Sequence, residues 1–157
     1  MKHKIAVIGG STREQIVADT LREKGFFVSA FATEKSDQND PDIEICLQNA
    51  AALILPVRCN REDLYLEGSS PLCPIKINRD YLGLLAKDAV IYCGASSKEL
   101  RRIAEESGHI LKEIMEIDSV AIPNARLTAE GTVAYIMDHS LSSLSEISVA
   151  VFGYGRV

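Results

Sequence analysis

The amino-acid sequence predicts an α/β fold: a flavodoxin- or Rossmann-like, mostly parallel five-stranded sheet with helices on both faces. Three observations lead to this prediction. Short apolar runs rich in β-branched residues alternate with segments whose apolar residues recur at helical spacing. The apolar runs are largely continuous, as in strands buried on both faces of a parallel sheet. Glycines and capping side chains separate the two kinds of segment.

The apolar runs mark five predicted strands, at 5–8, 26–32, 51–57, 89–93 and 110–115. The last of these runs is the most polar, so we expect it at an edge of the sheet. A polar and acidic loop is predicted at 33–41. The irregular segment 60–79 contains Gly68, Pro71 and Pro74, which indicates a surface excursion or a hairpin over one end of the sheet.

The predicted helices have recognisable ends. Ser11 or Thr12 is expected to cap the first helix, and Gly25 is expected to end it. Asn78 is expected to cap a helix further along the chain. The remaining helical segments are 43–48, 81–86, a helix that opens at Ser96 or Ser97 and continues to Glu106, and an apolar helix at 127–138 that follows an extended stretch at 118–124.

The last eleven or so residues indicate a domain boundary. Residues 148–152 are interpreted as a further buried strand, which continues into Gly153-Tyr154-Gly155-Arg156. A dinucleotide site needs a strand, a glycine-rich turn, a helix and a ribose-binding residue about 20 positions later. The sequence therefore predicts a substrate-side α/β domain at 1–146. It predicts the first strand and the start of the glycine-rich loop of a truncated cofactor domain at 147–157, with Gly153, Gly155 and Arg156 binding the cofactor.

Composition excludes several classes of function. Apolar residues make up 46% of the chain and charged residues 25%, as in ordinary globular proteins. A net charge of −5, from 17 basic and 22 acidic side chains, argues against nucleic-acid binding. No apolar run is long enough for a signal peptide or a membrane span, so a cytosolic protein is expected. The four cysteines form no C-x-x-C pair and the three histidines are scattered, so no metal site is predicted.

Ligands of open parallel sheets bind at the carboxyl ends of the strands. The candidate substrate-binding residues therefore follow the first, third and fourth strands: Gly10, Ser11, Thr12, Arg13, Val57, Gly94, Ser96 and Ser97. Glycines permit a close backbone approach, a helix N-terminus favours an anion, and Arg13 can hold a carboxylate with two hydrogen bonds. The alternative is that the first set is a tight turn with a capping serine and the second a simple helix cap.

The segment 122–132 gathers polar groups ahead of an apolar helix. Asn124 lies in a predicted loop there and is a further candidate for substrate binding. Gly131 inside the helix costs about 1 kcal/mol relative to alanine, which a close helix or ligand approach would explain, although a packing glycine is an equal alternative. Glu130 and His139 are candidate acid or base groups. A histidine at a helix C-terminus is, however, more often a partner of the helix dipole.

Several stretches in order resemble the N-terminal domain of the A subunit of dipicolinate synthase, from the sporulation pathway of endospore-forming bacteria. They are Lys4 to Gly10 with Arg13, Ile54 to Val57, Gly94 to Ser96, Ile117 to Ile122, Glu130 to Thr132 with His139, and Val149 to Arg156. The resemblance spans essentially the whole chain. Ser11 departs from it, because an acidic residue is expected there in some members, and 60–79 matches only loosely.

The resemblance implies a two-domain enzyme with the layout of 2-hydroxy-acid and alanine dehydrogenases. A front domain helps to bind substrate, and a following Rossmann domain binds NADP. The implied reaction oxidises a dihydrodipicolinate-type intermediate to dipicolinate in the mother-cell cytoplasm of a sporulating bacterium. Implied partners are this small dicarboxylate and the flavoprotein-like B subunit of dipicolinate synthase, and a homo-oligomer is also compatible. Neither nucleic acid nor a membrane is an expected partner.

A small dicarboxylate needs two anion-binding places. Arg13 with the turn 9–12 is expected to provide one, and Ser96 with Ser97, or Asn124, the other. The chain by itself is expected to be inactive, because the nicotinamide would be held by the domain that follows. The alternative hypothesis is a flavodoxin-like module that binds a small acid or docks a partner protein through its apolar helix, without catalysis.

Overall fold

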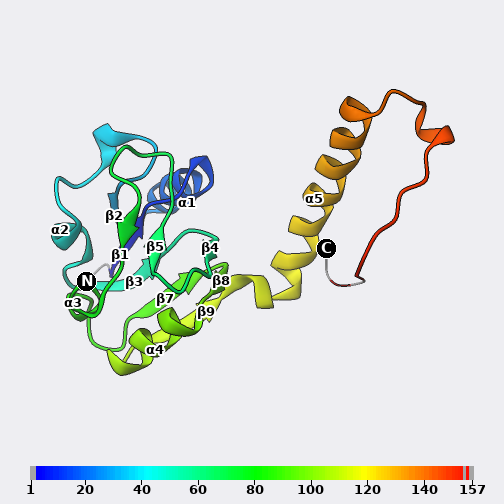
Figure 1. Ribbon diagram of the computed structural model, residues 1–157. Coiled ribbons are helices and arrows are strands. Elements are labelled where there is room, and N and C mark those ends of the chain that lie inside the picture. The colour runs from blue at the N-terminus through cyan, green and yellow to red at the C-terminus, as the bar shows by residue number, and fades with distance from the viewer. Residues whose placement is uncertain (1–2, 154, 156–157) are drawn as a thin grey trace. The chain divides into compact units, whose positions relative to one another are not determined.

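The structure is a computed structural model that describes residues 3–153 and residue 155. The chain divides into two compact units, Met1–Ile114 and Met115–Val157 (Figure 1). Within the described residues, no helix combines the length and the apolar character that crossing a bilayer requires.

The first unit contains the five-stranded parallel sheet that the sequence predicts. Its strands lie in the order β2-β1-β3-β7-β9, and every neighbouring pair is parallel. The order 2-1-3-4-5 of the sheet strands is that of flavodoxin-like folds. The polar fifth strand lies at an edge, as predicted. The bounds are β1 Lys4–Ile8, β2 Phe27–Phe31, β3 Ala50–Ile54, β7 Val90–Cys93 and β9 Ile110–Glu113.

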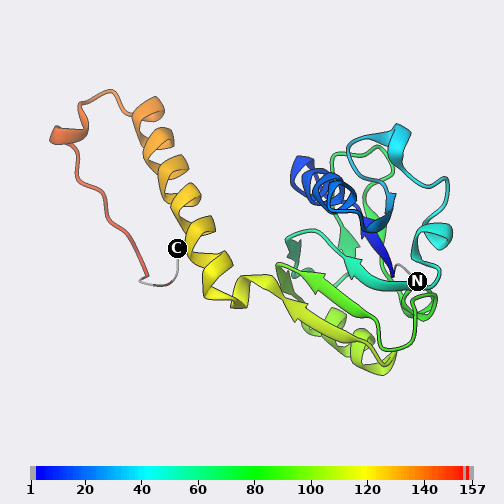
Figure 2. The ribbon, with the colours of Figure 1, turned by 180° about the vertical axis from the view of Figure 1, so that it is seen from behind.

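Helices cover both faces of this sheet, which confirms the predicted α/β class. Helix α1 lies on one face, and α2, α3 and α4 lie on the other (Figures 1 and 2). This arrangement follows from right-handed crossovers, because the chain moves from β1 to β2 in one direction and then from β2 through β3 and β7 to β9 in the other. The bounds are α1 Thr12–Glu23, α2 Ile43–Leu47, α3 Arg79–Gly83 and α4 Lys98–Glu106, with a short 3₁₀ turn η1 at Ser36–Gln38.

Capping side chains set three of these helix starts. Asp42 accepts a hydrogen bond from the Glu44 N–H at 2.7 Å, and Asn78 accepts one from the Tyr81 N–H at 2.8 Å. Ser97, not Ser96, caps α4 and accepts from the Leu100 N–H at 3.0 Å. These bonds satisfy amide groups that have no partner within their own helix.

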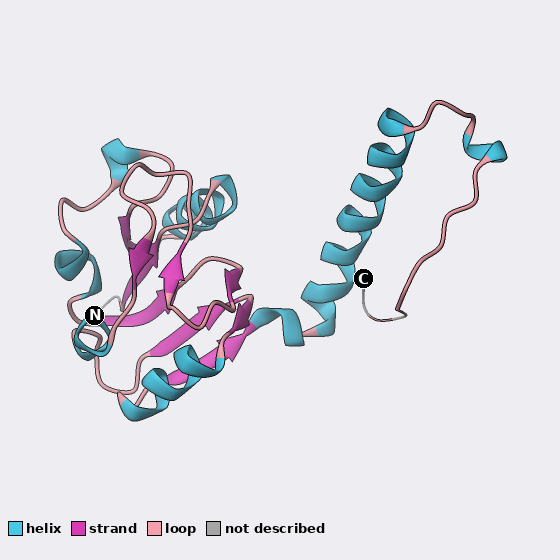
Figure 3. Ribbon diagram, viewed as in Figure 1, coloured by secondary structure: helices cyan, strands magenta, loops and turns pink. Residues whose placement is uncertain are grey.

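The segment 60–79 forms short strands instead of a plain loop. β5 (Tyr65–Leu66) pairs antiparallel with β6 (Ile75–Lys76), which confirms the hairpin alternative (Figure 3). Just before the segment, β4 (Arg58–Cys59) pairs parallel with β8 (Ala95–Ser96) and prolongs the contact between β3 and β7.

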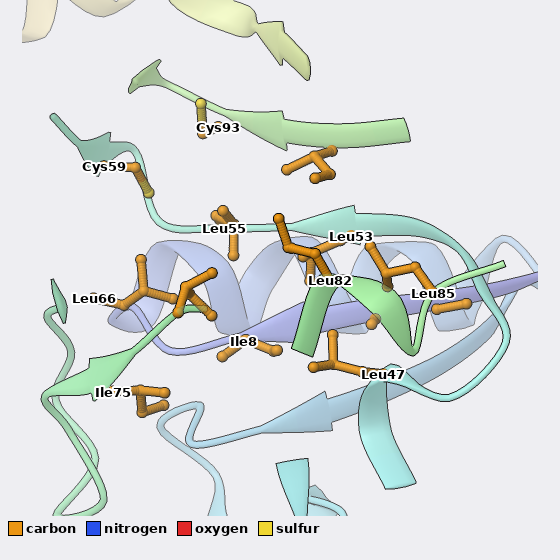
Figure 4. Close-up of a cluster of buried hydrophobic side chains, with 14 of the residues drawn as sticks. Ile8, Leu47, Leu53, Leu55, Cys59, Leu66, Ile75, Leu82, Leu85 and Cys93 are labelled. Atoms are coloured by element: carbon orange, nitrogen blue, oxygen red, sulfur yellow. The ribbon is translucent and has the colours of Figure 1, made fainter. Parts of the chain in front are cut away.

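The main core lies between the sheet and the α2–α4 face. Leu53 and Ile8 from the sheet meet Leu47 of α2 and Leu82 of α3, and all four are fully buried. Leu66 of the hairpin lies beside Ile8 in the same cluster (Figure 4). The hairpin is therefore anchored by apolar burial at the end of the sheet that carries the strand C-termini.

Burial also lowers the reactivity of the four cysteine thiols, because it raises their pKa values. Desolvation raises the pKa of Cys46 and of Cys93 to about 12, and it raises that of Cys59 further. Cys73 is half-buried and has a smaller rise for the same reason. Because the thiolate is the reactive form, we expect iodoacetamide at pH 8 to label only Cys73 in the native chain. Mass spectrometry after labelling in guanidinium should show all four sites. Labelling of Cys46 in the native chain would contradict the burial.

The second unit differs from the prediction at its start. Helix α5 spans Asp118–His139, so the prediction of an extended stretch at 118–124 is wrong. The β-branched Val120 and Ile122 have reduced helix propensity, but propensity is a weak guide where the backbone bonds can form. The N–H groups of Val120 and Ala121 both donate to the Ile117 carbonyl at 2.9 Å. The turn η2 (Ile114–Glu116) precedes the helix.

The end of the second unit contains the turn η3 (Leu144–Glu146) and an extended segment. The strand predicted at 148–152 is not formed, because a strand needs a neighbour for its backbone hydrogen bonds and none pairs with these described residues. Phe152 is 95% exposed.

Candidate functional site

A cleft of about 690 Å³ lies at the carboxyl ends of β1 and β3. The strand order reverses between these two strands, and ligands of open α/β sheets bind at such a switch point. Three segments line the cleft: the turn and first residues of α1, the chain after β3, and one side of the hairpin. The lining residues are Gly10, Ser11, Thr12, Arg13, Glu14, Pro56, Val57, Arg58, Glu67, Gly68 and Ser69.

The hairpin forms one wall by pairing with Gly10. The Gly10 N–H donates to the Glu67 carbonyl at 3.1 Å, and the Ser69 N–H donates to the Gly10 carbonyl at 2.8 Å. A Cβ on Gly68 would lie 2.5 Å from the Gly10 carbonyl oxygen, so only glycine permits this approach. The Gly10 N–H is therefore already bonded. Gly10 thus forms a wall of the cleft and donates no hydrogen bond into it.

Glu14 connects the two other walls. Its carboxylate accepts a hydrogen bond from the Ser11 N–H at 2.8 Å and another from the Val57 N–H at 3.3 Å. The side chain is buried, with 5% of its surface exposed. No role was predicted for Glu14 from the sequence. The signal was its position three residues after Ser11, the spacing of a capping box.

Positive charge without a partner distinguishes this cleft. Arg13 and Arg58 are both exposed and line it, and neither forms an ion pair with any residue that the structure describes. Two acidic side chains also line the cleft: the exposed Glu67 is paired with Arg61 at 3.0 Å, and the buried Glu14 carboxylate accepts hydrogen bonds from the Ser11 and Val57 amides. The N-terminus of α1 adds a partial positive charge. The cleft therefore has the charges that suit a small anion. Arg58 begins β4, after a short connection from β3. The sequence placed Pro56, Val57 and Arg58 after the third strand, but only Val57 was chosen as a binding residue.

A neighbouring cleft of about 510 Å³ suits an anion less well. Its arginine, Arg61, pairs with Asp63 at 2.6 Å as well as with Glu67. The Arg61 guanidinium, through its hydrogen bond, lowers the pKa of Asp63 to about 2, so this carboxylate keeps its charge at any ordinary pH. The guanidinium is therefore neutralised by the protein itself.

The helix start at Ser96 and Ser97, predicted as a second anion place, is bonded to a carboxylate of the same chain. The Lys98 and Glu99 N–H groups at the start of α4 donate to the carboxylate of Glu62, at 3.3 and 3.1 Å. Ser97 is buried and satisfies a third amide of the same helix. The chain's own carboxylate thus occupies this helix N-terminus.

Ser96 is held by a second carboxylate. Its N–H donates to Glu113 at 2.6 Å, and Arg101 pairs with the same carboxylate at 2.5 Å. Burial alone would raise the pKa of Glu113, but the hydrogen bonds from Ser96 and the Arg101 guanidinium outweigh burial and lower it. Ser96 therefore has a structural role.

Gly94 lets its backbone lie directly against Val57, and it does not line the cleft. A Cβ at this buried position would collide with the Val57 carbonyl oxygen and would lie 2.6 Å from Val57 Cγ1. The same carbonyl accepts a hydrogen bond from the Ala95 N–H at 2.9 Å. Among the predicted substrate-binding residues of the first unit, the structure thus brings Gly10, Ser11, Thr12, Arg13 and Val57 together in one cleft, and places Gly94, Ser96 and Ser97 elsewhere.

Comparison with known proteins gives the family. The profile of the N-terminal domain of the dipicolinate synthase A subunit matches residues 4–115. The chain belongs to this family. A relative, the A subunit of dipicolinate synthase from Bacillus subtilis (strain 168), is 28% identical over 159 aligned positions, which cover 98% of this chain and 54% of the relative. The chain thus spans about half the length of the relative.

Solved structures agree with this family. The crystal structure of dipicolinate synthase, A chain, from Bacillus subtilis aligns with a TM-score of 0.75 at 26% identity, over 91% of this chain and 50% of that one. The A subunit of dipicolinate synthase from Bacillus halodurans has the same fold, with a TM-score of 0.75 at 20% identity, over 90% of this chain and 50% of that one. The Rossmann-like α/β fold is therefore that of the dipicolinate synthase A subunit.

The other predicted site residues of this family member lie in the second unit. Asn124 is in helix α5 rather than in a loop, and its carbonyl accepts from the Thr128 hydroxyl at 3.4 Å. Glu130 is exposed on the same helix. The His139 ring stacks on Tyr135 with centroids 3.9 Å apart, at the C-terminal turn where a helix dipole favours a cation.

The predicted cofactor residues are described only in part. Gly153 has a φ of +100°, which glycine adopts readily, whereas Arg156 lies outside the described residues. The described side chains form no group of three or more potential metal ligands.

Proposed function

We propose that this chain forms the substrate-side domain of the A subunit of a dipicolinate synthase. The proposed enzyme is an NADP-dependent oxidoreductase that converts a dihydrodipicolinate-type intermediate to dipicolinate during sporulation. Membership of the family supports the proposal. The observation that carries it is the cleft at the switch point between β1 and β3, which holds two guanidiniums without acidic partners among the described residues.

The proposed ligand is a small dicarboxylate, and the two arginines match its two charges. Arg13, with the N-terminus of α1, would bind one carboxylate through charge-assisted hydrogen bonds. Arg58 would bind the other carboxylate. It takes the role first expected of Ser96 and Ser97, because the helix N-terminus at those serines is bonded to Glu62. The role of the chain in the reaction would be to hold and orient the ring while hydride leaves it.

The chain covers 54% of its relative from Bacillus subtilis, and we assign the NADP site to the part of the A subunit that the chain does not cover. The positive φ of Gly153 fits the tight turn of a dinucleotide loop. When bound, the nicotinamide would accept the hydride. We place that site in a following Rossmann domain that 147–157 would begin. We further propose that the protein binds the B subunit of dipicolinate synthase and acts in the mother-cell cytoplasm.

We expect the 157-residue chain to bind dipicolinate but not to oxidise dihydrodipicolinate with NADP. A ligand that binds only the native state raises the melting temperature, so dipicolinate should stabilise the chain in a thermal-shift titration. Absorbance at 340 nm should show no NADPH formation. Benzoate, with one carboxylate, is the control and should stabilise less. Turnover by this chain, or no stabilisation at millimolar dipicolinate, would contradict the proposal.

A second candidate function is a docking module that binds a small acid without catalysis. The second unit favours it, because an apolar groove of about 480 Å³ lies between α5 and the segment that follows it. Residues such as Val133, Ile136 and Val149 line the groove. A chain extended beyond residue 157 separates the two candidates: NADP-dependent turnover favours the enzyme, and binding of dipicolinate without turnover favours the module.

A further inference from the structure

Glu14 is the one buried carboxylate among the described residues of the cleft. It is 5% exposed, and burying a charged carboxylate costs free energy unless hydrogen bonds compensate. Two backbone amides, those of Ser11 and Val57, donate to its carboxylate, and the Ser11 hydroxyl also donates to it at 3.5 Å. These amides lie 46 residues apart in the sequence (57 − 11 = 46), so Glu14 connects two separate walls of the cleft.

The two amides belong to the backbone segments that carry Arg13 and Arg58. Glu14 directly follows Arg13 in α1, and Val57 directly precedes Arg58. The carboxylate therefore holds together the two backbone segments that carry the free guanidiniums. Gly10 makes room for it, since a Cβ at Gly10 would collide with the Glu14 carboxylate.

We propose that Glu14 is a positioning residue, which sets the spacing between Arg13 and Arg58 and so selects ligands with two anionic groups over ligands with one. This rests on the proposed function, in which both arginines bind one dicarboxylate. A ligand that bridges two cations gains affinity when their spacing is set before binding. A ligand with one carboxylate needs only one guanidinium, so the spacing does not affect its affinity.

The test compares Glu14→Gln with the unaltered chain by isothermal titration calorimetry. The probes are pyridine-2,6-dicarboxylate and pyridine-2-carboxylate. Glutamine has the shape of glutamate, but its NH₂ group cannot accept a hydrogen bond, so one of the two amide contacts is lost. We expect the dissociation constant of the dicarboxylate to rise about tenfold and that of the monocarboxylate to change less than about twofold.

Glu62→Gln is the matched control. Glu62 also accepts two backbone N–H groups at a helix N-terminus, but it does not line the cleft. This variant should leave both affinities unchanged. Glu14→Asp keeps the charge and shortens the side chain, so it should fail to restore dicarboxylate binding. Amide hydrogen exchange provides a readout without ligand: in Glu14→Gln, whichever of the Ser11 and Val57 N–H groups faces the new NH₂ group should lose protection, and in Glu62→Gln both should keep it.

The outcomes separate this proposal from the proposed function. If the unaltered chain binds no dicarboxylate, both fail. If it binds and Glu14→Gln binds the dicarboxylate equally well or more tightly, only the positioning role of Glu14 is refuted. Equal weakening of both ligands would also refute it, because Glu14 would then support the cleft in general instead of the spacing.

Discussion

Replacing Arg13 and Arg58 together by alanine is expected to abolish the thermal stabilisation that dipicolinate gives the chain. Each guanidinium would form charge-assisted hydrogen bonds with one carboxylate, and a bond to a charged group contributes about 1.5–3 kcal/mol. Losing both would cost at least about 3 kcal/mol, or more than a hundredfold in affinity. Thermal-shift titrations of the single and double variants measure this loss. Each single variant should lose part of the stabilisation.

Arg79→Ala is the control for this experiment. Arg79 is exposed and pairs with Glu106 at 3.3 Å, away from the residues that line the cleft. Its removal takes away one positive charge, as each single variant does, so an unchanged dipicolinate affinity would show that position, rather than overall charge, matters. Binding to the unaltered chain should also weaken with added salt. Full stabilisation of the double variant by dipicolinate would rule out the proposed anion site.

Gly94→Ala is expected to destabilise the first unit strongly. The new Cβ would collide with the Val57 carbonyl, which is backbone and cannot rotate away. Overpacking of this kind costs about 1–3 kcal/mol, which corresponds to a fall in melting temperature of about 5 °C or more. Circular dichroism during heating measures it. Because Val57 lines the cleft, dipicolinate should also stabilise this variant less.

Gly83→Ala provides the comparison. Gly83 is the last residue of α3, and an added Cβ there would have nothing within 4 Å. Its melting temperature should stay the same or rise slightly, because alanine restricts the unfolded chain more than glycine does. Equal melting temperatures for the two variants would contradict the assigned role of Gly94.

Local patterns were sufficient for most of the first unit. The apolar run at 89–93 predicted β7, and Asn78 was correctly predicted to cap α3. Such signals are short-range, because a strand or a cap depends on residues a few positions apart. The start of α5 was missed, since the β-branched Val120 and Ile122 locally favour an extended chain while the backbone hydrogen bonds form a helix.

The site was predicted in part. Arg13 and Val57 were both placed at carboxyl ends of strands by the rule for parallel sheets, and both line the cleft. Ser97 was a candidate for substrate binding because a capped helix start and an empty anion site look alike in sequence. Glu62, which occupies that helix start, lies 36 and 37 positions from its two donors, beyond any local pattern.

By itself, the sequence determined the class of fold, the order along the chain of the five sheet strands and of α1 to α4, and the strand end where Arg13 lies. Tertiary structure alone decided which charges remain unpaired: Glu62 neutralises one helix N-terminus, whereas Arg58 keeps no acidic partner among the described residues. The physical reason is the distance along the sequence over which the deciding interactions act. Secondary structure arises from contacts between near neighbours in the chain, but the availability of a charged group depends on whichever distant side chain folding brings beside it.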